Sequence, residues 1–111
     1  MNPIRKPVAI VLHHSVTPQS TSWDTISSWG KNGYADYHFG VDFNGKIYQG
    51  CPINQVAAHC GLDYGDYSPS GVFNQNSLAI CAIGNFETQT MNQSQINGIV
   101  QCIKNIKAVY P

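Results

Sequence analysis

The first apolar run of the chain, residues 8–12, leads directly into two histidines. Its five small or β-favouring residues follow Pro7 and suit a central strand that is covered on both faces. Neighbouring side chains on a strand point to opposite faces, so only one of His13 and His14 can face a given site. The pattern predicts a buried strand that presents one imidazole at a cleft, although a polar strand end with two solvent-facing histidines would have the same pattern.

Two further strand signals follow. Residues 36–50 hold aromatic and β-branched runs on both sides of an Asn-Gly pair, which indicates a β-hairpin. Residues 76–87 form a second continuous apolar strand, closed by a Gly-Asn pair. Between them, residues 56–61 predict a loop that carries a histidine, and the glycines and tyrosines of residues 61–71 suit a surface loop beside a site.

Two amphipathic patterns predict helices. Ser22 is a plausible N-cap for the first, with Trp23, Ile26 and Trp29 on one face before two glycines end it. Residues 92–109 predict the second and longer helix. Its apolar positions recur at intervals of three and four residues: Ile96, Ile99, Val100, Ile103, Ile106 and Val109. Both helices should cover a mixed sheet, which gives an α/β or α+β layered domain.

Composition narrows the class of partner. The 111 residues have room for one compact core, and no repeat or linker divides them. Six basic and six acidic residues cancel, so no charged field indicates nucleic acid or an anionic membrane. The abundant Asn, Gln, Ser and Thr suit hydrogen bonding to sugars and peptide amides. The apolar run near the N-terminus is too short for a signal-peptide core or a membrane span.

The four cysteines show no Cys-x-x-Cys spacing. Cys81 and Cys102 fall within apolar patterns and are expected to be small core residues. Cys51 and Cys60 flank one loop and could form a disulfide in an oxidising compartment, whereas a reduced pair is the default for a chain without a visible signal peptide.

Four motifs, in this order, resemble the zinc-dependent N-acetylmuramoyl-L-alanine amidases of the phage-lysozyme and peptidoglycan-recognition-protein type. They are the apolar strand before His13, the Tyr37-His38-Phe39 segment of the hairpin, the Ala58-His59 loop and the apolar strand ending in Gly84-Asn85. The resemblance covers residues 8–110 and implies the fold of that family. That fold is an α/β domain with a mixed central β-sheet flanked by helices, here with the last strand missing.

The resemblance also implies roles for individual residues. His13 matches the first zinc ligand, whereas His14 matches a position that is not a ligand. Tyr37 matches the catalytic tyrosine beside the metal, and Cys81 falls where one branch of the superfamily has a catalytic glutamate. The residues expected to bind the substrate are His14, His38, His59, Tyr64, Tyr67 and Asn85.

These matches imply a peptidoglycan hydrolase. Zn²⁺ would be the cofactor and would lower the pKa of its water toward about 7. The bond cleaved would join N-acetylmuramic acid to L-alanine of the stem peptide, so the partner is bacterial peptidoglycan, with no nucleic acid and no membrane. A phage endolysin, cytoplasmic until it is released at lysis, or an autolysin of the bacterial cell wall would have such a sequence.

One departure from the family concerns the zinc ligands. In the family, a second histidine and a third ligand, cysteine or aspartate, lie beyond the last long helix, whereas this sequence stops at Pro111. We therefore expect a single amidase-like domain over residues 1–111 that is incomplete at its C-terminus. Such a form should hold little zinc and should associate with itself through an uncovered sheet edge.

Two other functions stay open. A non-catalytic peptidoglycan-binding module, or an inactive fragment, would keep the groove and lack the metal. A Cys-His nucleophilic hydrolase would use Cys60 with His38 or His59, and would need the thiol and the imidazole paired in space.

Overall fold

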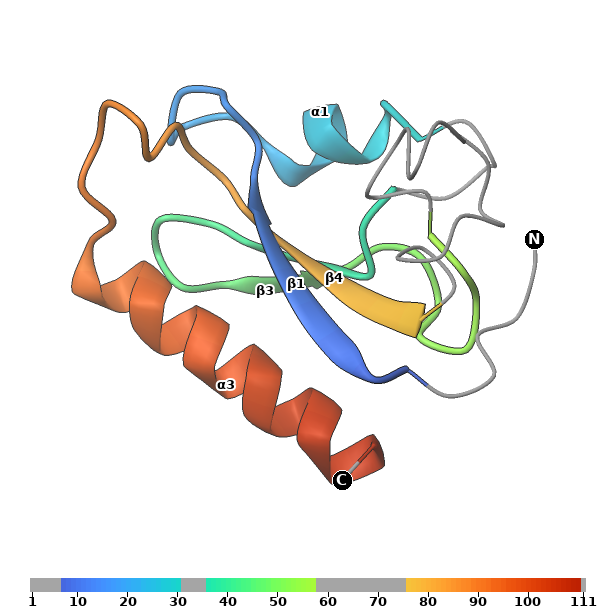
Figure 1. Cartoon of the computed structure of the whole chain (residues 1–111). Helices are drawn as coiled ribbons and strands as arrows, with labels where there is room; N and C mark the ends of the chain where they lie inside the picture. The colour runs from blue at the N-terminus through green and yellow to red at the C-terminus, as the bar shows by residue number, and fades with distance from the viewer. Residues whose placement is uncertain (1–6, 31–35, 58–75, 111) are drawn as a thin grey trace.

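The computed structural model of the chain describes residues 7–30, 36–57 and 76–110. Four strands and two helices lie within these residues (Figure 1). They are β1 (Ala9–His14), α1 (Trp23–Ser27), β2 (Phe39–Val41), β3 (Ile47–Gln49), β4 (Ser77–Ala82) and α3 (Gln93–Val109). None of the described helices has the length and apolar character needed to cross a membrane.

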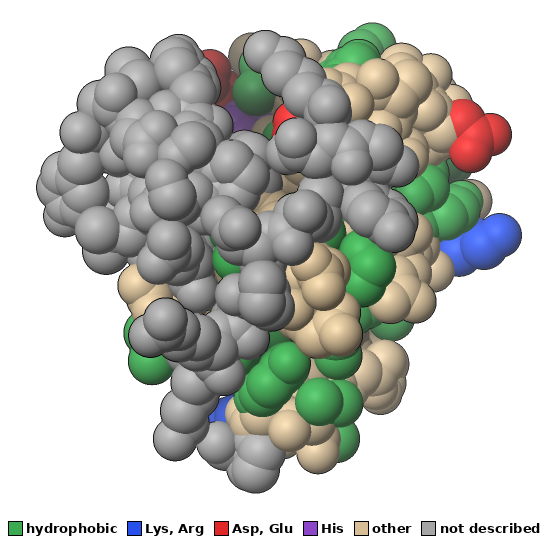
Figure 2. Space-filling view, turned by 90° about the vertical axis from the view of Figure 1, so that its right-hand side faces the viewer, with side chains coloured by type: hydrophobic (Ala, Val, Ile, Leu, Met, Phe, Trp, Pro, Cys, Tyr) green, Lys and Arg blue, Asp and Glu red, His purple; other side chains and the backbone are tan. Residues whose placement is uncertain are grey.

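The strands form one mixed sheet in the order β1-β4-β2-β3. β4 pairs in parallel with both β1 and β2, and β3 pairs antiparallel with β2. α1 and α3 lie on opposite faces of this sheet (Figure 1). Where Figure 2 shows described residues, acidic and basic side chains are few and hydrophobic ones are spread between them. The architecture confirms the predicted α/β class with a mixed sheet flanked by helices.

The β2–β3 hairpin also forms as predicted, because its turn satisfies its own backbone. Gly45 adopts a φ of 83°, the left-handed conformation that favours glycine. The Asp42 carboxylate accepts hydrogen bonds from the N–H groups of Asn44 and Lys46, each at 3.0 Å. This local order connects the end of β2 to the start of β3, and Tyr37 and His38 precede β2 at the other end of that strand.

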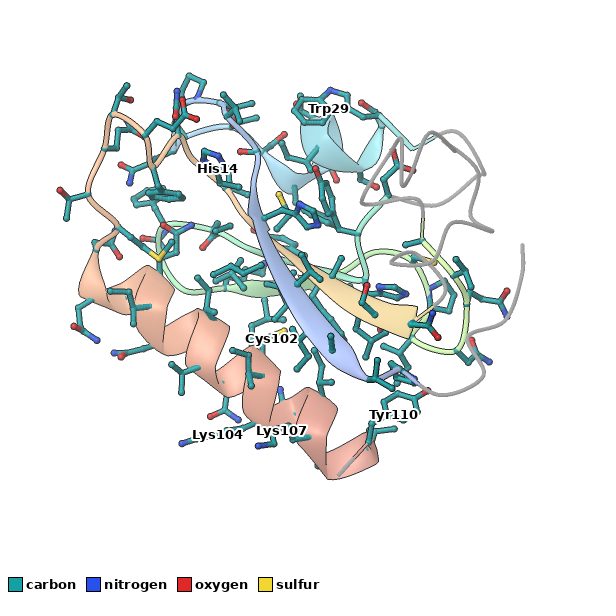
Figure 3. The ribbon with its side chains drawn as sticks, viewed as in Figure 1. His14, Trp29, Cys102, Lys104, Lys107 and Tyr110 are labelled. Atoms are coloured by element: carbon teal, nitrogen blue, oxygen red, sulfur yellow. The ribbon has the colours of Figure 1, made fainter. Side chains whose placement is uncertain are left out.

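α3 begins close to the predicted residue 92: Asn92 is its N-cap, and its side-chain oxygen accepts from the Gln95 N–H at 2.8 Å. Lys104 and Lys107 project from the helix away from the sheet (Figure 3). The face turned toward the sheet differs from the predicted stripe. It consists of Gln95, Gly98, Ile99, Cys102 and Ile106.

Ile96, Val100 and Val109 were predicted to belong to the buried stripe of α3, but they are exposed. Close packing on the hairpin explains this correction. A Cβ added to Gly98 would stand 2.5 Å from the Gly45 carbonyl oxygen, so only a residue without a side chain allows this approach. Gln95, on the same side of the helix, is fully buried, because its Nε2 donates to the carbonyls of Val41 and Ile83, each at 3.0 Å.

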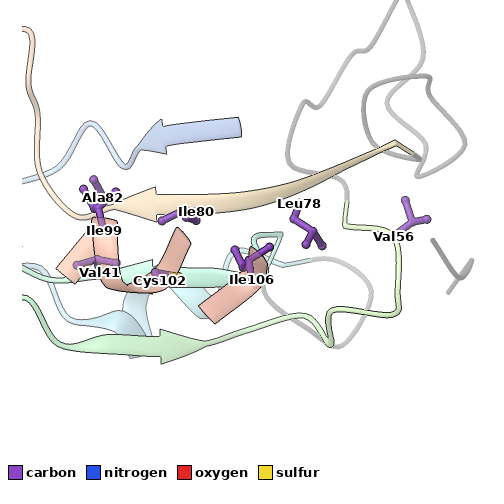
Figure 4. Packing of buried hydrophobic residues seen from close by; sticks show 8 residues of the cluster. All are labelled: Val41, Val56, Leu78, Ile80, Ala82, Ile99, Cys102 and Ile106. Atoms are coloured by element: carbon purple, nitrogen blue, oxygen red, sulfur yellow. The ribbon is translucent and has the colours of Figure 1, made fainter. Parts of the chain in front are cut away.

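β4 is the centre of the core, and all six of its residues are buried. Its alternate side chains face two clusters, as the period of a strand requires. The cluster toward α3 comprises Val41, Val56, Leu78, Ile80, Ala82, Ile99, Cys102 and Ile106 (Figure 4). The cluster toward α1 comprises Trp23, Ile26, Cys81 and Ile83. The prediction that Cys81 and Cys102 are buried is therefore confirmed.

Within residues 7–30, 36–57 and 76–110, β1 is the edge strand of the sheet, which corrects the prediction that residues 8–12 form a central strand covered on both faces. Among these described elements, α3 packs mainly on β2, β3 and β4 and gives β1 little cover. Val8 is 79% exposed and Leu12 is 52% exposed. An apolar run in the sequence identifies a strand. The position of that strand in the sheet depends on which other strands pair with it.

α1 is shorter than its sequence pattern suggests. Ser22 is its N-cap, as predicted, and accepts a hydrogen bond from the Thr25 N–H at 3.2 Å. Trp23 and Ile26 are buried, whereas Trp29 lies beyond the last helical residue and is exposed. The prediction of one shared apolar face is therefore correct for the first two of these residues and wrong for Trp29.

Candidate functional site

The candidate site lies at the carboxyl ends of the parallel strands β1 and β4. His13 and Cys81 are direct partners in the register of these strands, so their side chains stand on the same face of the sheet. Tyr37, which precedes β2, packs against this face. The ring centroids of His13 and Tyr37 are 5.5 Å apart, with an angle of 56° between the ring planes. An imidazole, a phenol and a thiol therefore share one small volume.

The Tyr37 ring packs against the cluster that contains Cys81. Burial raises the pKa of Tyr37 to about 12, with further contributions from Cys81 and Asp36. Burial likewise raises the pKa of the Cys81 thiol to about 12. At neutral pH the phenol and the thiol therefore both keep their protons.

Burial lowers the pKa of His13 from its ordinary value of 6.5, and the charge of neighbouring His14 lowers it further. The ring is therefore neutral at neutral pH. A neutral imidazole has a nitrogen lone pair available for a metal ion or for a hydrogen bond.

His14 faces the opposite side of the sheet from His13, as the strand period predicts. Its Nδ1 accepts a hydrogen bond from the Phe86 N–H at 3.1 Å. Figure 3 shows it at the carboxyl end of β1, toward the segment that follows β4. There it borders a hollow of about 310 Å³, together with Leu12 and Met91. His14 is thus positioned by the backbone and stays next to a concave surface.

His38 was expected to bind the substrate, but its surroundings are those of a core residue. The side chain is fully buried. Its Nδ1 accepts from the Ala79 N–H at 3.1 Å, so Nε2 carries the proton and donates to the Gln55 carbonyl at 2.7 Å. With both nitrogens bonded to the backbone, the ring has no atom left for a substrate. The same bonds argue against His38 as the base of a Cys-His hydrolase.

Asn85 lies in the turn after β4. Its side-chain oxygen accepts from the Glu87 N–H at 3.2 Å, and its carbonyl accepts from the N–H groups of Thr88 and Gln89. It borders a hollow of about 280 Å³ that Val16 and Thr17 also line. These hydrogen bonds fix the turn at the border of the hollow. A direct contact of Asn85 with substrate stays a prediction.

The other expected substrate-binding residues, His59, Tyr64 and Tyr67, lie outside the described residues, as does Cys60. Two features were missed by sequence reasoning. Ser15 links the end of β1 to the turn after β4, because its Oγ accepts from the Gly84 N–H at 2.9 Å. On the α1 face, Trp23 and Tyr48 stack with centroids 5.9 Å apart and border a hollow of about 260 Å³. Neither feature has a local sequence signal, because each joins distant segments.

The described residues do not by themselves fit a catalytic zinc centre. Such a centre has three protein ligands and one open position. Residues 7–30, 36–57 and 76–110 contain no group of three or more His, Cys, Asp or Glu side chains able to hold a metal ion. Of the ligands that the family resemblance implies, only His13 is among them.

Solved structures with the same fold include both recognition proteins and amidases. PGRP-SA from Apis mellifera has a TM-score of 0.78 and 25% identity, with 99% of this chain and 68% of that chain covered. The amidase LysC from Clostridium intestinale URNW has a TM-score of 0.70 and 25% identity, with 95% and 65% covered. The chain thus spans about two thirds of their length.

A third similar structure shows the fold alone, because its identity is only 20%. It is the PGRP-LCa and PGRP-LCx ectodomain complex with bound tracheal cytotoxin, with a TM-score of 0.77 and 99% of this chain and 68% of that chain covered. Among curated proteins, none matches this chain.

The family match covers almost the entire sequence. The family described as N-acetylmuramoyl-L-alanine amidase matches residues 3–111, which include every element of the sheet and both helices. This match agrees with the fold and with the order of the motifs around His13 and Tyr37. The chain belongs to the N-acetylmuramoyl-L-alanine amidase family.

Proposed function

We propose that the chain is the substrate-binding and catalytic part of a peptidoglycan amidase that cleaves the bond between N-acetylmuramic acid and L-alanine. One observation carries the proposal. His13, the residue that matches the family's first ligand, has its ring 5.5 Å from that of Tyr37, the residue that matches the catalytic tyrosine. Both side chains belong to one face of the sheet, at the carboxyl end of β1.

Tyr37 is the donor in this proposal. Hydrolysis of an amide develops negative charge on the carbonyl oxygen, and a preorganised hydrogen-bond donor stabilises that charge. With its pKa raised to about 12, Tyr37 keeps its proton throughout the neutral range. A single donor of this kind commonly lowers the barrier by about 3 kcal/mol.

Zinc is the cofactor that the family implies, and His13 is the described residue that would bind it. When bound, the metal supplies an activated water at neutral pH. His13 is neutral at that pH, as a ligand must be. One imidazole does not make a catalytic centre, so the zinc assignment is tested separately from the role of Tyr37.

The substrate assignment is supported by the surface. Muramyl peptides combine sugar hydroxyls, amides and apolar side chains, and the chain carries a formal net charge of zero. The hollow beside Trp23 and Tyr48 offers aromatic surface next to Ser22 and Thr21, a mixture that suits sugars and amides. We propose bacterial peptidoglycan as the partner, in the setting of a phage lysin or a cell-wall autolysin.

A binding module is the second candidate. It is favoured by the single matching ligand among the described residues and by the similarity to peptidoglycan recognition proteins. Such a module would hold the muramyl peptide and leave its amide intact. The same peptidoglycan-binding surface would serve both functions, so a measurement of binding alone does not distinguish the enzyme from the binding module.

The test uses the protein as its gene encodes it, incubated with purified muropeptides. Mass spectrometry follows the free stem peptide, and metal analysis after dialysis measures bound zinc. Release of the peptide with a new L-alanine N-terminus, together with stoichiometric zinc lost in a His13→Ala variant, would support the amidase. Calorimetric binding without any peptide release would support the binding module instead, and neither binding nor release would overturn both.

A further inference from the structure

Val16 has a backbone conformation that its side chain disfavours. Among the described residues, it is the one non-glycine residue with a positive φ, at 57°. In this left-handed region the Cβ of an L-residue crowds the following carbonyl group, and a second branch at Cβ adds to the crowding. Glycine and asparagine are the usual residues there. A valine in this conformation is strained, so the surrounding structure must hold it.

Backbone hydrogen bonds hold Val16 in this conformation. The Ser15 N–H donates to the Ala82 carbonyl at 3.1 Å, and the Val16 N–H donates to the Gly84 carbonyl at 2.9 Å. The Gly84 N–H in turn donates to the Ser15 Oγ at 2.9 Å. These bonds join the turn after β1 to the turn after β4, and the two turns lie side by side (Figure 1). The backbone therefore cannot relax at Val16 without breaking bonds between the two turns.

The side chain of Val16 gains little from the core, because it is 57% exposed. Instead, it lines the hollow of about 280 Å³ beyond the end of β1. The other residues that line this hollow are uncharged: Thr17, Pro18, Asn85, Thr88 and Gln89. Val16 comes three residues after His13, so the hollow borders the end of the strand that carries the candidate site. The strained backbone thus presents an apolar side chain to a neutral surface beside the site.

We propose that Val16 is a substrate-contacting residue, whose isopropyl group packs against a methyl group next to an amide in the muramyl peptide. The inference rests on the peptidoglycan function proposed for the site, and it applies to the enzyme and to the binding module alike. Such a methyl group belongs to the acetamido group of N-acetylmuramic acid and to the alanine of the stem peptide. Val16 and Pro18 offer apolar surface to the methyl, and the hydroxyl and amide side chains around them suit the neighbouring amide.

Two substitutions separate the strain from the contact. Val16→Asn relieves the strain, because asparagine tolerates a positive φ, and it removes the isopropyl group. Val16→Thr keeps the branched Cβ, and hence the strain, but replaces one methyl by a hydroxyl. Val100→Thr is the matched control, since Val100 is also exposed but lies on α3 and does not line the hollow.

Calorimetric titration with a purified muropeptide measures the affinity, and thermal melting measures the stability. We expect Val16→Asn to melt a few degrees above the wild type and to bind with a Kd about five- to tenfold higher. Val16→Thr should raise the Kd by about three- to fivefold, the effect of one methyl contact, without a gain in melting temperature. Val100→Thr should bind like the wild type.

Wild-type affinity in both Val16 variants would overturn the contact. A melting temperature of Val16→Asn no higher than that of Val16→Thr would overturn the strain. Absence of binding by the wild type would instead overturn the peptidoglycan function itself. A muropeptide without its sugar acetyl group identifies the methyl: the loss caused by Val16→Thr should shrink with this ligand if the acetamido group is the partner, and should stay the same if alanine is.

Discussion

At the scale of single residues, a tyrosine beside a histidine is useful as a donor only while its hydroxyl is protonated and held in one direction. Burial supplies the first condition by raising the pKa of Tyr37 to about 12. Packing against the cluster that contains Trp23 and Cys81 favours the second, because it limits the directions that the ring can take. His13 and His38 show how similar side chains diverge: His13 lies beside Tyr37 in the site, whereas His38 has both nitrogens bonded to backbone groups.

The first prediction concerns Tyr37→Phe. The variant should fold and melt like the wild type, because only one oxygen is removed, and kcat should fall by about a hundredfold, as loss of a preorganised donor typically costs. Release of stem peptide from muropeptides measures the rate. Tyr110→Phe is the control, because Tyr110 is the C-cap of α3 and packs with the cluster on the opposite face of the sheet. Equal rates for wild type and Tyr37→Phe would remove Tyr37 from the mechanism.

The second prediction concerns His38 and pH. Burial lowers its pKa below 6.5, so the unfolded chain binds this proton more tightly than the folded one does. The stabilisation is therefore complete above pH 6.5 and is lost as the pH falls from 6.5 toward the lowered value. Thermal melting between pH 8 and 5 should show this loss.

His38→Ala should lower the free energy of unfolding by about 2–4 kcal/mol, because the Ala79 N–H and the Gln55 carbonyl lose their partner. The slope against pH should also become shallower than in the wild type. Part of the slope should remain, since the pKa of His13 is lowered as well. An unchanged slope in His38→Ala would show that another group governs the pH dependence.

At the scale of elements, a single glutamine joins the long helix to the ends of two strands. Gln95 on α3 donates to Val41 at the end of β2 and to Ile83 just after β4. Among the described residues, its Oε1 is a buried side-chain atom without a hydrogen-bond partner, so the amide is oriented by its two donated bonds. These bonds hold the strand ends that carry the site.

The third prediction follows from this link. Gln95→Met preserves the length of the side chain but removes the Gln95 donor from the Ile83 carbonyl and leaves the Val41 carbonyl with the Ile83 N–H alone. The free energy of unfolding should therefore fall by about 1–3 kcal/mol. Urea denaturation measures it. The matched control is Gln101→Met on the same helix, because Gln101 is exposed and contacts Asn105. Similar stability of the two variants would refute the role assigned to Gln95.

At the scale of the whole molecule, no described strand pairs with the outer edge of β1, which lies beside an apolar surface. Its six residues include neither proline nor a carboxylate nor a lysine, the features that commonly protect an edge from pairing. A hollow of about 440 Å³ lies between the first half of β1 and the end of α3, lined by Val8, Ile10, Ile106 and Tyr110 among others. We therefore propose that the chain associates with itself through the edge of β1 and the apolar side chains beside it.

The fourth prediction tests that surface. The chain should show concentration-dependent association in analytical ultracentrifugation, and Leu12→Lys should reduce it at least severalfold, since a charge on an edge strand opposes pairing. Leu12 is half-exposed, so the folded monomer should tolerate the change. Phe43→Lys, an exposed hairpin position, is the control. Association that is equally strong in both variants would place the contact elsewhere.

The elements of this protein were predictable from its sequence because their signals are local. The apolar strands, the hairpin turn and the N-cap Ser22 depend on strand period, backbone conformation and nearby N–H groups, and all of them formed. The motif order around His13 and Tyr37 was also sufficient to identify the family.

The tertiary structure decided what depends on contacts between distant segments. Sheet order made β1 an edge, and the approach of Gly98 to Gly45 turned the buried face of α3 away from the predicted stripe. Likewise, whether a histidine serves the site or the core depends on which backbone groups surround it, as at His38. Tyr37 packs against the cluster of Cys81 because β2 pairs beside β4 in the sheet. A sequence encodes side-chain chemistry locally, whereas a site requires distant residues to meet.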